Sequence, residues 1–125
     1  LDENWEIWLD GGHNENAASA LVKQAAQWQE QDGRPLYIIA AMLDHKDPAN
    51  FIRPLEPFVK KLYVTTLESE PHMLKIQILK DKLPDAQSAA SYRAALQDLQ
   101  NDTPPGRILI CGSLYLAGHV LKDIA

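Results

Sequence analysis

Two stretches of uninterrupted apolar residues constrain the fold of this chain more than any other feature. Residues 36–42 read LYIIAAM and residues 108–111 read ILIC, and neither stretch alternates between apolar and polar side chains. A strand with one face in water alternates, so continuous runs indicate strands that helices cover on both faces. The sequence therefore predicts a largely parallel sheet between two layers of helices.

Helix and strand patterns alternate along the rest of the chain. A first strand is predicted over residues 6–10, followed by a helix over 14–31 with an apolar stripe at helical spacing. The remaining predicted elements are a short or kinked helix from 48, a strand at 62–66, a helix from about 70 to 84, a short edge strand within 85–89, a helix at 91–100, a strand at 107–111 and a last helix after 113, with Leu114, Ala117, Leu121 and Ile124 on one face. This order predicts a three-layer α/β/α, Rossmann-like domain with a mostly parallel sheet of five to six strands.

Composition excludes several classes of protein. The 125 residues suit one compact domain, and the formal net charge of −5 comes without the basic patch typical of nucleic-acid binding. No apolar run approaches the roughly 20 residues of a membrane-spanning helix, and the acidic, polar residues 1–4 do not resemble a signal peptide. The single Cys111 lies in an apolar run and is predicted to be a buried, inert thiol. A cytoplasmic protein without nucleic-acid or membrane partners is expected.

Three loops that follow predicted strands carry the candidate site residues: residues 10–14, 42–47 and 111–113. In open α/β sheets, ligands bind at the carboxyl ends of the strands. Asp10 could accept hydrogen bonds from a ribose, and His13 could contact a phosphate or a reacting carboxyl group. The structural alternatives are an acid that caps the turn and a histidine hydrogen-bonded within it.

The two later loops offer groups suited to an anion. Lys46 could bind a carboxylate or phosphate beside a helix start, although a solvated loop lysine explains it as well. Ser113 could offer its hydroxyl to a carboxylate or simply cap the last helix, and Asn14 and Asp47 are best explained as helix caps. The chain has no nucleotide-binding glycine motif, zinc spacing or hydrolase elbow, so neither a metal site nor a complete catalytic apparatus is predicted.

Three segments together resemble one enzyme family. Residues 8–14, WLDGGHN, resemble the LDGAHNP element of folylpolyglutamate and dihydrofolate synthases, which belong to the Mur-ligase superfamily of ATP-dependent amide ligases. Residues 41–48 resemble the DKD loop of that family, and residues 110–118, ICGSLYLAG, resemble its CGSLYLAG ending. The chain departs from the pattern at Gly12, where alanine is common, and at Glu15, where proline is. The resemblance predicts that residues 1–125 form the C-terminal domain of a longer enzyme.

The resemblance implies a reaction and a division of labour. ATP phosphorylates the carboxylate of a folate or dihydropteroate, and the amino group of glutamate then displaces the phosphate. By that resemblance Asp10 and His13 would contact ATP, with His13 near the reacting carboxylate, while Lys46 and Ser113 would lie near glutamate. The phosphate loop and the Mg²⁺ ligands would belong to a central domain outside this chain. The isolated domain, expected to be monomeric, would then be inactive.

Two further expectations concern the arrangement and the alternatives. The resemblance implies a mixed sheet in which the first strand can run antiparallel to the others, so that Asp10 would not share an edge with the later loops. Asp10 and His13 are expected to face solvent, with no complete pocket around them. The alternative functions are a stand-alone α/β nucleotide-binding or regulatory module and the C-terminal domain of a cell-wall Mur ligase.

Overall fold

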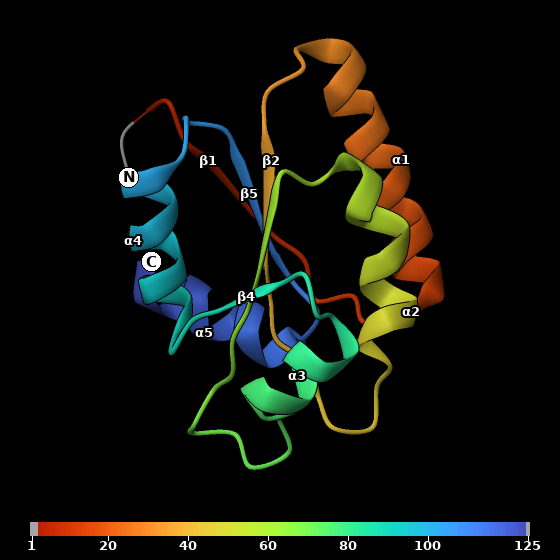
Figure 1. Ribbon diagram of the computed structural model, residues 1–125, viewed down its shortest axis with the longest axis vertical. Coiled ribbons are helices and arrows are strands. Elements are labelled where there is room, and N and C mark those ends of the chain that lie inside the picture. The colour runs from red at the N-terminus through yellow and green to blue at the C-terminus, as the bar shows by residue number, and fades with distance from the viewer. Residues whose placement is uncertain (1–2, 125) are drawn as a thin grey trace.

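A five-stranded sheet forms the centre of the molecule in the computed structural model, which describes residues 3–124 (Figure 1). The strands are ordered β1-β5-β2-β3-β4, with bounds Glu6–Leu9, Arg107–Cys111, Leu36–Ala40, Lys61–Val64 and Gln87–Ser88. Every pair of neighbouring strands is parallel, including β1 with β5. The expectation of an antiparallel first strand is therefore wrong, whereas the predicted α/β class with a parallel-type sheet is confirmed.

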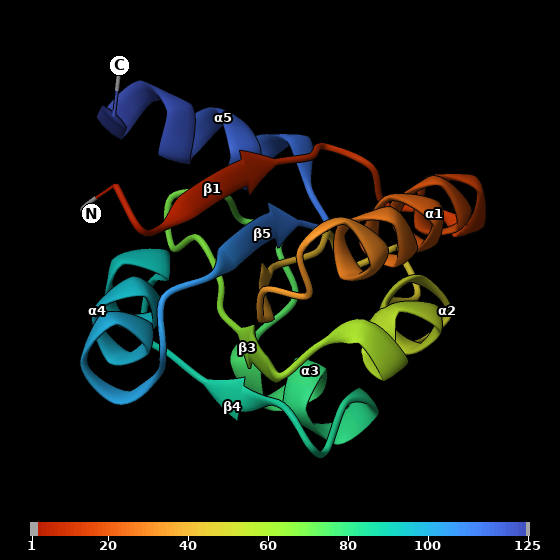
Figure 2. The ribbon, with the colours of Figure 1, turned by 90° about the horizontal axis from the view of Figure 1, so that it is seen from above.

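Helices cover both faces of this sheet (Figure 2). One layer consists of α1, α2 with the 3₁₀ helix η1, and α3, and the other consists of α4 and α5. Their bounds are Glu15–Gln31, Pro48–Ile52, Arg53–Phe58, Ile76–Lys82, Tyr92–Asp102 and Leu114–Ile124, respectively. None of the helices in the described part of the chain is both long enough and apolar enough to cross a membrane.

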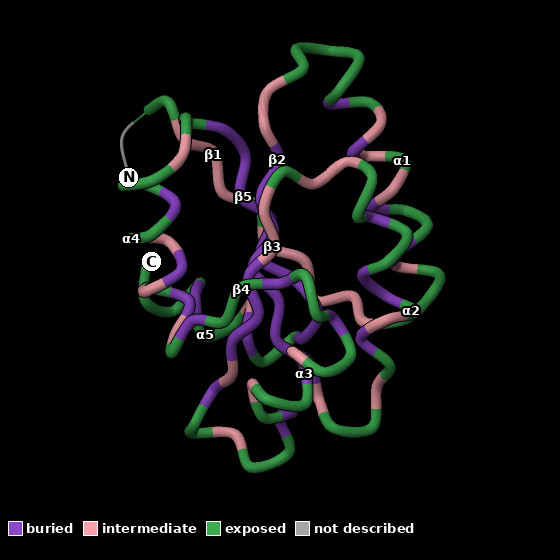
Figure 3. Tube along the Cα trace, in the orientation of Figure 1, coloured by how far each residue is buried: buried purple, intermediate pink, exposed green. Residues whose placement is uncertain are grey.

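Two cores lie on opposite sides of the central strands. In β2, Ile38 and Ala40 pack into the core beneath α1, whereas Tyr37 and Ile39 pack into the core beneath α4 and α5. All five residues of β2 and all five of β5 are buried, as the purple strands of Figure 3 show. Burial on both faces explains why these strands carry no alternating polar positions.

The helix predicted over residues 70–84 is shorter in the structure. It begins only at Ile76, because the preceding loop pairs with the segment after β2. Met73 forms an antiparallel bridge with Leu43, and the Leu74 amide donates to the Met42 carbonyl at 2.8 Å. These tertiary contacts use backbone groups that a longer helix would have bonded internally.

The last helix also turns a different face to the sheet than its apolar pattern indicates. Leu116 and Val120 of α5 are fully buried, whereas Leu114 and Leu121 are 70% and 55% exposed. Both residue pairs have suitable helical spacing, so periodicity did not distinguish between them. The tight connection from β5 into α5 decides which pair meets the sheet.

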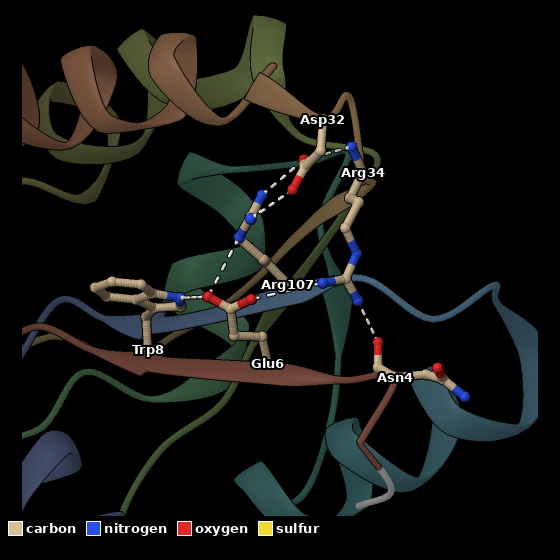
Figure 4. Close-up of polar contacts among 6 residues, drawn as sticks. All are labelled: Asn4, Glu6, Trp8, Asp32, Arg34 and Arg107. Atoms are coloured by element: carbon tan, nitrogen blue, oxygen red, sulfur yellow. Dashed lines mark hydrogen bonds and ion pairs between the residues drawn. The ribbon is translucent and has the colours of Figure 1, made fainter. Parts of the chain in front are cut away.

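A buried arginine links the C-terminal end of α1 to the amino-terminal edge of the sheet through hydrogen bonds (Figure 4). Arg107 begins β5, is 5% exposed, and donates hydrogen bonds of 3.1 and 2.8 Å to the two carboxylate oxygens of Asp32. It also lies 3.4 Å from Glu6 and stacks 5.0 Å from the ring centroid of Trp28. The Arg107 hydrogen bonds hold the pKa of Asp32 below its usual value. This cluster is structural, and it lies at the edge opposite the candidate site.

Candidate functional site

The three candidate loops come together at the carboxyl edge of neighbouring strands. They follow β1, β5 and β2, which are adjacent and parallel in the sheet. The Asp10 amide donates to the Ile110 carbonyl at 3.0 Å, and the Ala41 amide donates to the Cys111 carbonyl at 3.3 Å. The shared edge predicted from the strand-loop pattern is confirmed.

This edge is also where the direction of the helical connections changes. The helices that follow β1 and β2 cover one face of the sheet, whereas α5, which follows the intervening β5, covers the other. In open α/β sheets, ligands bind outside the carboxyl ends of the strands at such a change of direction. The loops 10–14, 41–47 and 112–113 meet at this edge.

The loop between β1 and α1 is held by short-range hydrogen bonds. Asp10 Oδ1 accepts from the Gly12 amide at 2.6 Å, and the Asn14 side chain caps α1 by accepting from the Ala17 amide at 3.0 Å. A Cβ on Gly12 would lie 2.4 Å from the Ala17 Cβ, so in this chain glycine allows the loop to approach its own helix closely. The turn-capping role weighed for Asp10 is present, and its second carboxylate oxygen keeps its capacity to accept hydrogen bonds.

His13 carries the unusual polar group of this loop. The residue is half-buried, and its Nδ1 atom is inaccessible to solvent and has no hydrogen-bond partner in the described part of the chain. The alternative of a histidine bonded within the turn is therefore not observed at Nδ1. Buried polar atoms are rarely left unpaired, so Nδ1 of His13 has a hydrogen-bonding capacity that no described residue satisfies. Asp10 is half-buried as well, so each of the two side chains expected to face solvent keeps part of its surface exposed.

Lys46 lies in a loop that tertiary contacts hold in place. Its amide donates to the Leu43 carbonyl at 3.1 Å, and the neighbouring Asp44 amide donates to the His72 carbonyl at 2.7 Å. The Asp47 side chain caps α2, as predicted, through the amides of residues 49 and 50. Among residues 3–124, no carboxylate forms an ion pair with half-buried Lys46. The contribution of residues 67–75 to this loop was not foreseen, because an irregular segment carries no periodic signal.

Ser113 sits at the N-terminus of α5 and is 1% exposed. Its Oγ accepts from the Tyr115 amide at 3.0 Å and from the Leu116 amide at 3.4 Å, and it lies 3.9 Å from the Met73 sulfur. The structure therefore assigns the hydroxyl to helix capping. Gly112, immediately before it, has φ of 101°, a conformation that favours glycine.

The electrostatics of this edge favour the binding of an anion, and its one cysteine is not a nucleophile. The N-termini of α1 and α5 both lie here, where unpaired amides and the helix dipole attract negative charge. Burial raises the pKa of the Cys111 thiol strongly, with the charge of Asp10 adding to the effect. The thiol is thus protonated and unreactive, as predicted. Within residues 3–124, no group of three His, Cys, Asp or Glu side chains could hold a metal ion.

The amino-acid sequence of residues 1–123 matches the model of a family described as the dihydrofolate synthetase C-terminal domain. The chain belongs to this family. The match lies in the folate branch that the three sequence segments resemble.

Individual relatives of this dihydrofolate synthetase C-terminal domain are longer proteins. The folylpolyglutamate synthase of Lacticaseibacillus casei is 31% identical over 118 residues, which are 94% of this chain and 27% of that protein. E. coli FolC in complex with DHPP and ADP is 25% identical and superposes with a TM-score of 0.84 over 99% of this chain and 30% of that one. A bifunctional folylpolyglutamate synthase/dihydrofolate synthase with Mn, AMPPNP and L-glutamate bound is 26% identical, with a TM-score of 0.82 and coverages of 99% and 30%. The chain thus spans less than a third of the length of these relatives.

Proposed function

We propose that residues 1–125 are the C-terminal domain of a longer ATP-dependent ligase that joins L-glutamate to a folate or dihydropteroate through an acyl phosphate. The observation that carries this proposal is the meeting of the loops after β1, β5 and β2 at one carboxyl edge, with the unpaired Nδ1 of His13 in the first of them. The relatives support it, since one was solved with DHPP and ADP and another with AMPPNP and L-glutamate.

The residues at the carboxyl edge offer groups that suit a nucleotide. Asp10 retains a carboxylate oxygen that can accept from ribose hydroxyls, and His13 has a buried nitrogen without a partner. The N-termini of α1 and α5 add a favourable field for phosphates. ATP supplies the phosphoryl group that activates the carboxylate, and in this proposal Mg²⁺ is held by ATP and by residues outside this chain.

Glutamate would bind at the loop formed by residues 41–47. The ammonium group of Lys46 has no ion-pair partner among the described residues and could bind a glutamate carboxylate. Ser113 would act mainly by holding the N-terminus of α5 in position, because its hydroxyl already caps that helix. Closure of this domain over the rest of the enzyme would align the reactants and exclude water that hydrolyses an acyl phosphate.

The proposal is tested by Asp10→Ala and His13→Ala in the full-length enzyme. Each variant is expected to lower kcat/KM for glutamate addition by about 10- to 100-fold, the loss of one charged or buried hydrogen bond to the reacting complex. Asp98→Ala is the matched control, since Asp98 is exposed on α4 in the opposite helical layer. Wild-type kinetics in both site variants would overturn the assignment.

The proposal also includes a monomeric, cytoplasmic protein and an inactive isolated domain. In this proposal the phosphate loop and the Mg²⁺ ligands lie outside this chain, and no group of three His, Cys, Asp or Glu side chains among residues 3–124 could hold a metal ion. Incubation of this chain with ATP, glutamate and dihydropteroate should yield no amide product, measured by mass spectrometry. Light scattering should give the mass of one chain. Amide formation by the isolated chain would contradict the proposal that catalysis needs residues outside it.

A further inference from the structure

A cavity lies apart from the carboxyl edge that carries the candidate site. It has a volume of about 500 Å³ and opens between η1 and the segment that leads from α3 into β4. Lys60 and the first residues of β3 border it, so it lies over the amino-terminal end of that strand. A volume of this size falls within the range of roughly 300–1,000 Å³ typical of small-molecule sites.

The floor of the cavity is apolar. Ile38, Ile52 and Leu83 contribute to it, and each is at most 3% exposed. Half-buried Val59 and Leu62 also belong to the apolar lining, as do Pro84 and Ala86. An apolar group placed here would leave water and contact a surface that is already packed from below, which favours binding.

The rim carries four charged side chains that no opposite charge neutralises. Arg53 and Glu56 lie on η1, Lys60 precedes β3, and Asp85 precedes β4. Among residues 3–124, none of the four takes part in an ion pair. Arg53 makes only a long hydrogen bond of 3.4 Å, to a backbone carbonyl of α3.

A fifth charged residue at the border is directed elsewhere. Lys61 Nζ lies 5.5 Å from the ring centroid of Tyr63, whose side chain packs in the core beneath α4. The ammonium group of Lys61 is therefore on the opposite face of the sheet from the cavity. The side chains available to an occupant are two cations and two carboxylates.

We propose that this cavity binds a small zwitterion with an apolar body, the chemical class of the α-amino acids with large apolar side chains. The carboxylate of such a ligand would pair with Arg53 or Lys60 and its ammonium group with Glu56 or Asp85. The side chain would cover the apolar floor. A simple anion would be attracted by the two cations of the rim and repelled by its two carboxylates, and a simple cation would experience the reverse.

This site is distinct from the one proposed for glutamate. The candidate site for glutamate lies at the carboxyl ends of β1, β5 and β2, whereas the cavity lies at the amino end of β3. Glutamate would also place a charged side chain against the apolar floor, which is unfavourable without a partner for that charge. The two proposals can therefore fail independently.

The test uses L-phenylalanine as the probe for the isotope-labelled chain, followed by amide resonances in NMR titrations. Saturable shifts are expected at residues 60–62 and 85–87. Arg53→Gln and Glu56→Gln should each weaken binding by about two- to fivefold, the effect of one partly exposed ion pair. Lys23→Gln is the matched control, because Lys23 is an exposed residue of α1 that does not line the cavity.

Three comparison ligands separate the contributions of charge and body. Phenylpropionate lacks the ammonium group, phenethylamine lacks the carboxylate, and L-alanine lacks the large apolar body, so each should bind more weakly than L-phenylalanine. The proposal is overturned if L-phenylalanine produces no saturable shifts at these amides, if the single-charge ligands bind equally well, or if both rim variants bind as the wild type does.

Discussion

A substitution at Gly112 tests how the candidate site is tied to the fold. Gly112 joins β5 to α5, has φ of 101°, and directs Ser113 into its capping position. An alanine Cβ there would lie 2.7 Å from the Ala41 carbonyl oxygen and 2.9 Å from the Met42 Cγ. Ala41 is fully buried and is hydrogen-bonded to β5, so its carbonyl cannot easily move away.

The expected cost of Gly112→Ala follows from these contacts. Positive φ costs an L-residue about 1–2 kcal/mol, and crowding against fixed neighbours adds about 1–3 kcal/mol. Restriction of the unfolded chain returns about 0.4–1 kcal/mol. The net loss in the free energy of unfolding is therefore about 3 kcal/mol, roughly the middle of the resulting range.

Gly118 provides the matched control for the same chemical change. It lies inside α5, its φ is not positive, and a Cβ there would have no atom within 4 Å. Gly118→Ala should stabilise the chain by about 0.5–1 kcal/mol, because alanine favours a helix interior over glycine. The two substitutions are thus expected to have opposite signs.

Urea unfolding followed by tryptophan fluorescence measures both effects. With a slope of about 2 kcal/mol/M, Gly112→Ala should lower the midpoint by about 1.5 M, and Gly118→Ala should raise it by about 0.3–0.5 M. A Gly112→Ala midpoint within error of the wild type would refute the argument, since neither the strain nor the contact with Ala41 would then exist.

Two further predictions concern ionisable groups. Because the Arg107 hydrogen bonds lower the pKa of Asp32 in the folded state, the pair contributes stability above the ordinary aspartate pKa of about 3.9 and loses it as the pH falls through the lower folded value. Asp32→Asn should therefore flatten the loss of stability in acid, and an unchanged acid limb in thermal melts would contradict this. Cys111, whose pKa burial raises, should react with a thiol reagent only on unfolding, so rapid labelling of the native chain would refute its burial.

The layers of the fold and the place of the candidate site were predictable because both depend on local patterns. Continuous apolar runs identified β2 and β5 as strands buried on both faces, and the strand-loop-helix order identified the edge that carries Asp10, Lys46 and Ser113. Helix caps at Asn14 and Asp47 were predictable for the same reason, since the capping side chain bonds amides two or three residues away.

What the tertiary structure alone decided depends on contacts between distant segments. The parallel direction of β1 follows from its pairing with β5, about a hundred residues later in the chain. The rotation of α5 that buries Leu116 rather than Leu114 depends on the turn at Gly112 against Ala41. The unpaired nitrogen of His13 likewise exists only because surrounding atoms exclude water from it. The sequence thus determined which elements form and which loops could bind a ligand, because these depend on residues near one another, whereas strand direction, helix rotation and the state of each site atom required the packed molecule.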